Sequence, residues 1–431
     1  MNMRDIQIGE NSPRELMHRV EVLETSMRIQ PDISLAFCLT LALCGISTLA
    51  GCSAGNAPDD NMHNPPTFDY CESTPPDDAC YASKRDPHSS QIELARAIAD
   101  KQMDNHPAET LDWDWGEATL MLGLIELYRV TGTTTYRDYF RDWIDYHLQE
   151  GYEIHTSDKC PPALAALQLY TESNDTKYRA VVEEVLDYLH NRALRTQEGG
   201  ISHLGTIELF GPTLWLDSLF MFGNVLTRWG ESQNDLSSLE FFREQFIIFS
   251  DALQRDSGFY LHAYNWPGEM DDDIFWARGN GWVAASGFEH LRVRYIRNET
   301  APEIATALGK LVPAIVASQD ADTGLWWTIL NRPDEIYLET SASALFTYAL
   351  ARAYRYDLVG NDILPVISKA QLGILSMIES DELGRPVVTG ISGPTNAGDF
   401  TMYAQVPLAR DISYGLGAVI LALIETSGLP L

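Results

Sequence analysis

Residues 127–147 read LYRVTGTTTYRDYFRDWIDYH, and residues 169–190 read LYTESNDTKYRAVVEEVLDYLH. Both stretches begin with a Leu-Tyr pair, and each continues through a polar turn into a Tyr-Arg pair; the corresponding pairs lie 42 residues apart. Apolar residues then recur at the three- and four-residue spacing of an amphipathic helix. This self-similarity predicts a repeated helical hairpin.

Helical periodicity continues through most of the remaining chain. We expect about twelve helices, or six hairpins, and few short strands, such as 326–329 and 386–389. Six hairpins can form an open solenoid or close into an (α/α)6 barrel. A solenoid has uniform repeats, whereas the segments 199–212 and 259–280 are unequal in length and rich in aromatic residues, His and Gly. Long decorated loops on a rigid scaffold usually carry function. The sequence therefore favours an all-α fold, the closed (α/α)6 barrel.

The composition excludes several classes of partner. The 431 residues include 61 acidic and 30 basic side chains, giving a formal net charge of −31. Nucleic-acid binding requires a basic surface, and an acidic surface is also repelled by anionic lipid head groups. Hydrophobic residues make up 45% of the chain, which suits a large buried core rather than disorder.

An apolar run over residues 33–50 ends in Leu-Ala-Gly-Cys at 49–52. A membrane-spanning helix is one interpretation, because the run is just long enough. Small residues at the end of an apolar stretch favour a processing site instead, and this ending resembles the bacterial lipoprotein signal. We therefore expect residues 1–51 to be a signal segment and Cys52 to carry lipid. The protein would be held on a membrane of the bacterial cell envelope, facing the periplasm or the exterior.

Residues 52–88 are rich in Asn, Asp and Pro and lack periodicity, so we expect a flexible linker ahead of a catalytic domain at 89–431. Cys71 and Cys80 lie nine residues apart in this linker and are candidates for a disulfide bridge. Cys160 would remain as a small buried residue. No spacing of Cys and His predicts a metal site, and no phosphate-binding loop predicts a nucleotide cofactor.

Asp217 stands in the apolar run Leu214 to Met221, where a carboxylate is costly to bury. It is either a structural acid near a helix start or a functional acid whose pKa is raised by burial. Asp158 precedes another predicted helix. It is either an ordinary loop or N-cap acid or a second carboxylate that faces Asp217.

The segment Trp276-Ala277-Arg278-Gly279-Asn280-Gly281-Trp282 is the most specific in the chain. An Arg fork matches a carboxylate, Trp rings stack on sugar faces, and Gly279 lets the backbone approach a ligand. An aromatic core would have little use for an Arg here, so we interpret the segment as a binding site. Trp115, His203 and His262 are weaker candidates, because a Trp often fills a core and a lone His is often structural.

Taken in order, these segments resemble the unsaturated rhamnogalacturonyl hydrolases of glycoside hydrolase family 105, over roughly residues 94–427. The resemblance rests on six motifs: Trp113-x-Trp115-Gly116, the Asp158 loop, Trp215 to Met221, Trp276 to Trp282, Glu339 to Ser343 and Tyr414-Gly415-x-Gly417. It implies an (α/α)6 barrel that acts on oligosaccharides left by polysaccharide lyases.

The implied reaction is hydration of a 4,5-unsaturated uronic acid at the non-reducing end, after which the next sugar is released. The resemblance gives Asp217 the acid/base role and makes Asp158 the second essential carboxylate. It implies that no metal or cofactor takes part. The residues that it places at the substrate are Trp115, His203, His262, Trp276, Arg278, Gly279 and Trp282.

The substrate is expected to be a uronyl-rhamnose oligosaccharide derived from rhamnogalacturonan or ulvan. Two other functions remain open at this point. One is an unsaturated glucuronyl hydrolase that acts on glycosaminoglycan fragments, and the other is a carbohydrate-binding lipoprotein without turnover.

Overall fold

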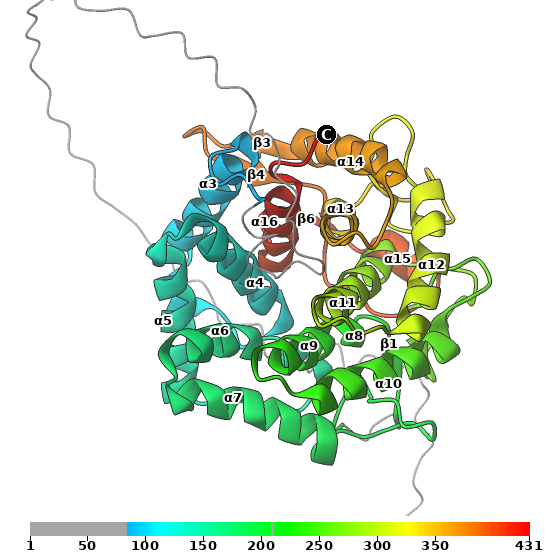
Figure 1. The fold of residues 1–431 in the computed structure, drawn as a ribbon. Helices are drawn as coiled ribbons and strands as arrows, with labels where there is room; N and C mark the ends of the chain where they lie inside the picture. The colour runs from blue at the N-terminus through cyan, green and yellow to red at the C-terminus, as the bar shows by residue number, and fades with distance from the viewer. Residues whose placement is uncertain (1–83, 208–210) are drawn as a thin grey trace, which may run out of the picture. The chain divides into compact units, whose positions relative to one another are not determined.

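The computed structural model describes residues 84–207 and 211–431. Within them, six helices form an inner ring and six form an outer ring (Figure 1). The inner helices are α4 (Trp115–Thr131), α6 (Ala163–Ser173), α9 (Gly223–Ser232), α11 (Ala277–Ile296), α13 (Thr340–Arg355) and α16 (Ser413–Thr426). The outer helices are α3 (Ser90–Asn105), α5 (Thr134–Glu150), α7 (Thr176–Asp187), α10 (Leu236–Leu253), α12 (Pro302–Ala317) and α14 (Leu364–Ser376).

Each inner helix packs against the next, and α16 packs against α4, so the ring closes. The predicted repeat is observed as the hairpins α4–α5 and α6–α7. The closed (α/α)6 barrel predicted from the sequence is confirmed. The sixth pair differs from a simple hairpin, because the last helix, α16, packs against the first described helix, α3.

Residue patterns explain which helices lie inside. All residues of α16 are buried, and so are nearly all residues of α11 and α13. A helix such as α16, whose residues are almost all apolar or small, belongs in an interior. Helix α11 also carries charged residues such as Glu289, which are buried because they form ion pairs within the barrel. The outer helix α7 instead buries only one face, which consists of Tyr178, Val181, Val182 and Val185.

Short elements decorate the barrel. The strands form three antiparallel pairs: β1 (Leu214–Trp215) with β2 (Ala263–Tyr264), β3 (Ile378–Ser380) with β4 (Pro386–Val388), and β5 (Ile391–Ser392) with β6 (Leu408–Ala409). The short helices are α8 (Ser218–Met221), α15 (Phe400–Gln405), η1 (Ala108–Thr110), η2 (Ser157–Lys159), η3 (Tyr188–Arg192) and η4 (Asn361–Ile363). The predicted strand at 386–389 is therefore β4, whereas 326–329 forms only isolated bridges.

Buried ion pairs join the C-terminal halves of five inner helices. We call this set, Glu126, Arg228, Glu289, Arg352 and Glu425, the ion-pair chain. Each residue pairs with the next, at N···O distances of 2.7, 3.1, 2.6 and 2.7 Å in that order. Because each residue belongs to a different helix, the chain fastens one end of the barrel.

The N-terminal expectations fall mostly outside the described residues. The signal segment, the lipidated Cys52, and the Cys71 and Cys80 pair all lie there. The end of the predicted linker is described and differs from expectation. Arg85 is buried and pairs with Glu425 at 2.7 Å, so the packed body includes residues that we assigned to the linker. No helix in residues 84–207 and 211–431 is long and apolar enough to cross a membrane.

Candidate active site

Backbone hydrogen bonds assemble the site from segments that are distant in sequence. The amide of Leu216 donates to the carbonyl of His262 at 3.0 Å, beside the paired strands β1 and β2. The amide of His203 donates to the carbonyl of Thr213 at 2.8 Å, and the amide of Ser157 donates to the carbonyl of His203 at 2.9 Å. The loops that carry the two predicted carboxylates are thereby held next to each other.

The site lies at the N-terminal ends of the inner helices. Trp115 is the first residue of α4, Trp276 immediately precedes α11, and Glu339 immediately precedes α13. Unpaired amide groups and the helix dipole make such ends electropositive. Asp114 caps α4 and Glu339 caps α13, so the start of α11, which has no side-chain cap, is the one of the three that favours an anionic ligand.

Asp217 is a buried carboxyl group at the start of α8, with 8% of its surface exposed. Its Oδ1 atom has no hydrogen-bond partner among the described residues. Burial raises the pKa of Asp217 to about 6, an effect that His203 opposes and Asp158 reinforces. A carboxyl group with this pKa can still donate a proton near neutral pH.

His203 contacts both carboxylates. Its Nε2 atom lies 3.6 Å from Oδ2 of Asp158, and its Nδ1 atom lies 3.7 Å from Oδ1 of Asp217. Nδ1 is also 3.0 Å from the hydroxyl of Ser218, and the ring stacks on Trp215 at a centroid distance of 4.4 Å. Burial lowers the pKa of His203, so the neutral ring is favoured. The two predicted carboxylates therefore flank a single imidazole.

Three aromatic rings form a second group beside Asp217. The ring of His262 stacks on Trp276 at 4.3 Å and meets Trp215 edge to face at 5.0 Å. Nε1 of Trp215, Nε1 of Trp276 and Nε2 of His262 are buried and have no hydrogen-bond partner in the described part of the chain. Buried polar atoms are rarely left unpaired in proteins, so these three nitrogens are available to the oxygens of a ligand.

Arg278 differs from expectation. Its side chain is 1% exposed, and its Nη1 and Nη2 atoms donate to the carbonyls of Ser392 and Gly393, both at 2.8 Å. Its guanidinium also lies over the rings of Trp276 and Tyr414. Its two Nη atoms therefore hold the β5 segment, whereas its buried Nε atom has no hydrogen-bond partner among the described residues, and binding of a uronate by Arg278 stays a prediction.

Gly279 also has a different role from the one expected. A Cβ atom at this position would lie 2.7 Å from side-chain atoms of both Leu216 and Trp276. Glycine is therefore required where α11 packs against the segment that carries Asp217. This close approach is to the protein's own side chains, and an approach to a ligand stays a prediction.

The two remaining predicted tryptophans pack against each other. Trp282 is buried in α11, 4.4 Å from Phe220 and 6.4 Å from Trp115 between ring centroids. Trp115 is partly exposed and stacks on Tyr414 at 4.6 Å. Of this pair, Trp115 therefore offers more surface to a sugar.

Sequence reasoning missed two residues that contact the predicted ones. Trp215 belongs to a motif that we quoted, but its contact with both histidines follows only from the β1–β2 pairing. Tyr403 lies 141 residues from His262, and its hydroxyl is 2.8 Å from the Nδ1 atom of that histidine. No motif or periodicity marks Tyr403.

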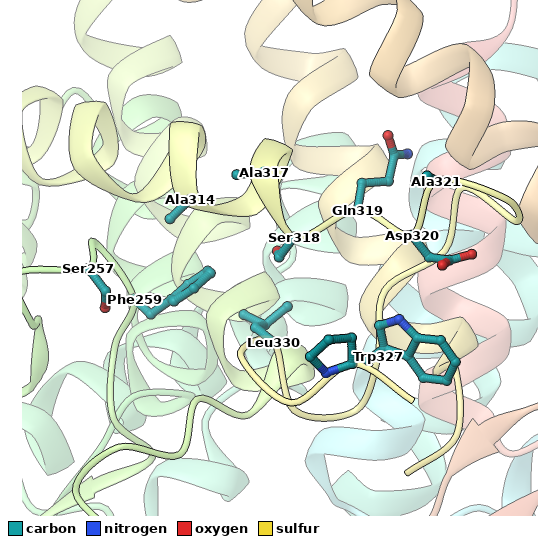
Figure 2. A pocket seen from close by; sticks show the side chains of 11 residues that line it. Ser257, Phe259, Ala314, Ala317, Ser318, Gln319, Asp320, Ala321, Trp327 and Leu330 are labelled. Carbon is teal, nitrogen blue, oxygen red and sulfur yellow. The ribbon is translucent and has the colours of Figure 1, made fainter. Parts of the chain in front are cut away.

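A surface cavity of about 460 Å³ lies elsewhere, between the end of α12 and the loop that follows Trp326 (Figure 2). None of the predicted site residues lines it. Its polar rim is already paired, because Gln319 donates to two carbonyls and Asp320 accepts from Thr323. The residues around Asp217 remain the candidate active site.

Comparisons with known proteins identify the family of the chain. The model of glycosyl hydrolase family 88 matches residues 94–429. The unsaturated rhamnogalacturonyl hydrolase YesR of Bacillus subtilis is 28% identical over 317 residues, which cover 73% of this chain and 89% of that protein. An unsaturated 3S-rhamnoglycuronyl hydrolase of Formosa agariphila is 24% identical over 67% of this chain and 80% of its own length.

Among solved structures, "a possible member of GH105 family" from Klebsiella pneumoniae is 26% identical, with a TM-score of 0.70. The alignment covers 78% of this chain and 93% of that one. The family match spans nearly the whole described body, and the relatives are unsaturated uronyl hydrolases. The chain is therefore a glycoside hydrolase that belongs to glycosyl hydrolase family 88 and is related to the unsaturated rhamnogalacturonyl hydrolases.

Proposed function

We propose that this enzyme removes a 4,5-unsaturated uronic acid from the non-reducing end of lyase-generated uronyl-rhamnose oligosaccharides. Asp217 donates its proton to C4, and positive charge develops on C5 and the ring oxygen. Water adds at C5 while its proton passes to the carboxylate of Asp217, which restores the acid. The resulting hemiketal opens, and the hemiacetal at C1 then releases the next sugar.

The observation that carries this proposal is the state of Asp217. Protonation of carbon requires an acid that keeps its proton near neutral pH. The pKa of Asp217 is raised to about 6 by burial, and its Oδ1 has no hydrogen-bond partner among the described residues. Asp158, on the other side of His203, adds negative charge that favours the protonated form of Asp217. We assign Asp158 to this role and to holding the attacking water.

The surrounding groups suit an anionic sugar ring. The unpaired ring nitrogens of Trp215, Trp276 and His262 can donate hydrogen bonds to oxygens of the uronate. The start of α11, which has no side-chain cap, offsets part of the cost of burying the carboxylate. We assign Trp115 to stacking against the sugar, whereas Trp282 and Gly279 hold the packing beneath Asp217.

The uronyl-rhamnose class is supported by the names of two relatives, one of which acts on rhamnogalacturonyl and the other on 3S-rhamnoglycuronyl substrates. Rhamnogalacturonan and the sulfated polysaccharide ulvan are therefore the sources that we propose. Glycosaminoglycan fragments form the alternative, because hydration of the double bond does not depend on the next sugar.

A panel of lyase products tests the proposal. Unsaturated oligosaccharides from rhamnogalacturonan, ulvan and chondroitin are each incubated with the enzyme, and loss of the ultraviolet absorbance of the conjugated uronate is followed. We expect the largest kcat/KM on a rhamnose-containing product. A preference for the chondroitin product would favour the glycosaminoglycan alternative. Binding of these oligosaccharides without any loss of absorbance would favour a carbohydrate-binding protein.

We further propose that Cys52 is lipidated and holds the enzyme on the bacterial cell envelope, with residues 1–51 removed. The support is the Leu-Ala-Gly-Cys sequence after an apolar run. Expression in a bacterium with labelled palmitate should label the wild type and not Cys52→Ser. Equal labelling of both proteins would contradict the proposal.

A further inference from the structure

His262 has two ring nitrogens in different environments. Nδ1 lies 2.8 Å from the hydroxyl of Tyr403, whereas Nε2 is buried without a hydrogen-bond partner among the described residues. The ring is held by stacking on Trp276 and by the edge contact with Trp215. Burial lowers the pKa of His262 well below its ordinary value, and the positive charge of Arg278 acts in the same direction. The ring is therefore neutral and carries its single N–H on one of the two nitrogens.

The partner of Nδ1 decides which nitrogen carries this hydrogen. Tyr403 is buried on α15, and Nδ1 of His262 is the one hydrogen-bond partner of its hydroxyl among the described residues. Burial raises the pKa of Tyr403, so the phenol keeps its proton. A buried O–H needs an acceptor, and Nδ1 is the one within reach among the described residues, so the phenol directs its O–H toward Nδ1 of His262. Nδ1 then acts as an acceptor, and the N–H is placed on Nε2.

Tyr403 lies on a segment that hydrogen bonds hold to the rest of the site. The segment from β5 to β6 carries α15, and its first residues are bound from four sides. Arg278 donates to the carbonyl of Ser392, as does the hydroxyl of Tyr414. The carboxylate of Glu339 accepts from the amide of Ser392, and the hydroxyls of Tyr337 and Ser392 are 2.9 Å apart. This accounts for the unexpected position of Arg278, because its fork anchors the segment that presents Tyr403.

From this geometry we propose that Tyr403 is a positioning residue for His262: it fixes the tautomer that directs Nε2–H to an acceptor oxygen of the substrate. The proposal rests on the proposed function, in which the substrate is an unsaturated uronate rich in acceptor oxygens. Without the Tyr403 hydroxyl, the N–H can occupy Nδ1, and Nε2 becomes an acceptor that faces the oxygens of the sugar.

A double-mutant cycle tests the coupling, with kcat/KM measured on the best lyase product. Tyr403→Phe should lower kcat/KM roughly 10- to 100-fold, as expected when a buried hydrogen bond is lost. In His262→Gln, the amide nitrogen replaces Nε2–H and has no tautomers. Adding Tyr403→Phe to His262→Gln should therefore change kcat/KM by less than about twofold. Tyr139→Phe is the matched control, because it removes a phenol hydrogen bond to the carbonyl of His106 on the outer surface.

Two results would overturn the proposal. The first is an equal cost of Tyr403→Phe in both backgrounds, which is what a purely structural role for Tyr403 predicts. The second is a Tyr403→Phe enzyme with wild-type kcat/KM.

A second comparison does not depend on the folding of Tyr403→Phe. Gln carries its amide nitrogen near the position of Nε2, whereas Asn carries it near that of Nδ1. His262→Gln should therefore exceed His262→Asn in kcat/KM by at least about tenfold, a difference set by one hydrogen bond. Equal rates, or a faster Asn variant, would contradict the tautomer assignment. If the wild type instead leaves every unsaturated oligosaccharide unchanged, the proposed function fails, and the tautomer is read from the ring ¹⁵N shifts of His262.

Discussion

Buried carboxyl groups at the two ends of the barrel have pKa values that are shifted in opposite directions. At the N-terminal ends of the inner helices, Asp217 is buried beside a neutral imidazole and another carboxylate, and its pKa is raised to about 6. At the C-terminal ends, Glu289 is equally buried but lies among Arg228, Arg292 and Arg352, and its pKa is held well below the ordinary value.

Burial alone would raise both pKa values, since it penalises the charged form of any carboxyl group. The neighbours decide the outcome. Three arginines keep Glu289 ionised and make it a structural cross-link. Asp217 has no arginine or lysine partner among the described residues, so it can bind and release a proton. One end of the barrel therefore stabilises the fold, and we propose that the other carries out the chemistry.

The largest effect is expected at Asp217. Asp217→Asn keeps the shape of the side chain but removes the proton donor, so kcat should fall by about 10²–10⁴-fold. Removing a buried charge should also raise Tm by a few degrees at pH 7. Kinetics and thermal unfolding of the same preparation check both effects. If kcat remains near that of the wild type, the acid lies elsewhere.

Glu289→Gln should lower the free energy of unfolding and leave kcat nearly unchanged. It leaves the cationic side chains of Arg228, Arg292 and Arg352 without a full counter-charge, and breaking a buried pair in this way costs about 3–5 kcal/mol of unfolding free energy. The kcat of the folded fraction should stay within about twofold of the wild type, because this end holds no reacting group. Urea unfolding provides the measurement. An unchanged free energy of unfolding would show that the ion-pair chain is not a cross-link.

Activity and stability should depend on pH in different ranges, because they are controlled by carboxyl groups at opposite ends of the barrel. The active form requires protonated Asp217, so kcat/KM should fall about tenfold per pH unit above its pKa of about 6. In the ion-pair chain, the pKa of Glu126 is lowered to about 2 and that of Glu425 is also lowered. Their stabilising contribution is complete above about pH 4.5 and is lost as the pH falls toward 2.

Activity should consequently fall steeply above pH 6, where Tm changes by no more than the few degrees that ionisation of Asp217 costs, and the large fall in Tm should come in acid. Rate profiles and unfolding scans over the same buffers check this. A fall in Tm that follows the loss of activity above pH 6 would mean that the rate profile reports unfolding rather than Asp217.

The smallest effect is expected on the surface. Arg243 on α10 pairs with Glu303 on α12 at 2.8 Å, but both side chains are substantially exposed. A double-mutant cycle on this pair should give a coupling energy of roughly 0.2–1 kcal/mol. The Arg243–Glu303 pair also links two helices, so Glu303→Gln is the matched control for Glu289→Gln. A cost as large as that of the buried variant would show that burial is not what makes the ion-pair chain effective.

The sequence predicted the features that depend on local pattern. The 42-residue repeat of Leu127 and Leu169 predicted the hairpins, and the unequal loops predicted a closed barrel. The apolar setting of Asp217 predicted a raised pKa. These inferences succeed because helical periodicity and an isolated carboxyl group are visible within a short window.

Features that depend on distant pairing escaped prediction. The pairing of α16 with α3, the contact between Tyr403 and His262, and the ion-pair chain all join residues far apart in the sequence. Arg278 shows the same limit. Its neighbours Trp276 and Gly279 indicated a binding site. The carbonyls to which its Nη atoms donate belong to Ser392 and Gly393, more than a hundred residues later. Only the closure of the ring brings such partners together.

The most direct test of the central claim is a time course of ultraviolet absorbance on a rhamnose-containing unsaturated disaccharide, with wild type and Asp217→Asn at equal concentration. We predict that the wild type removes the absorbance and releases the second sugar in equal amount, whereas Asp217→Asn binds the disaccharide and leaves the absorbance unchanged. Release of the second sugar while the absorbance persists would contradict hydration of the double bond. Wild-type rates from Asp217→Asn would contradict the role of Asp217.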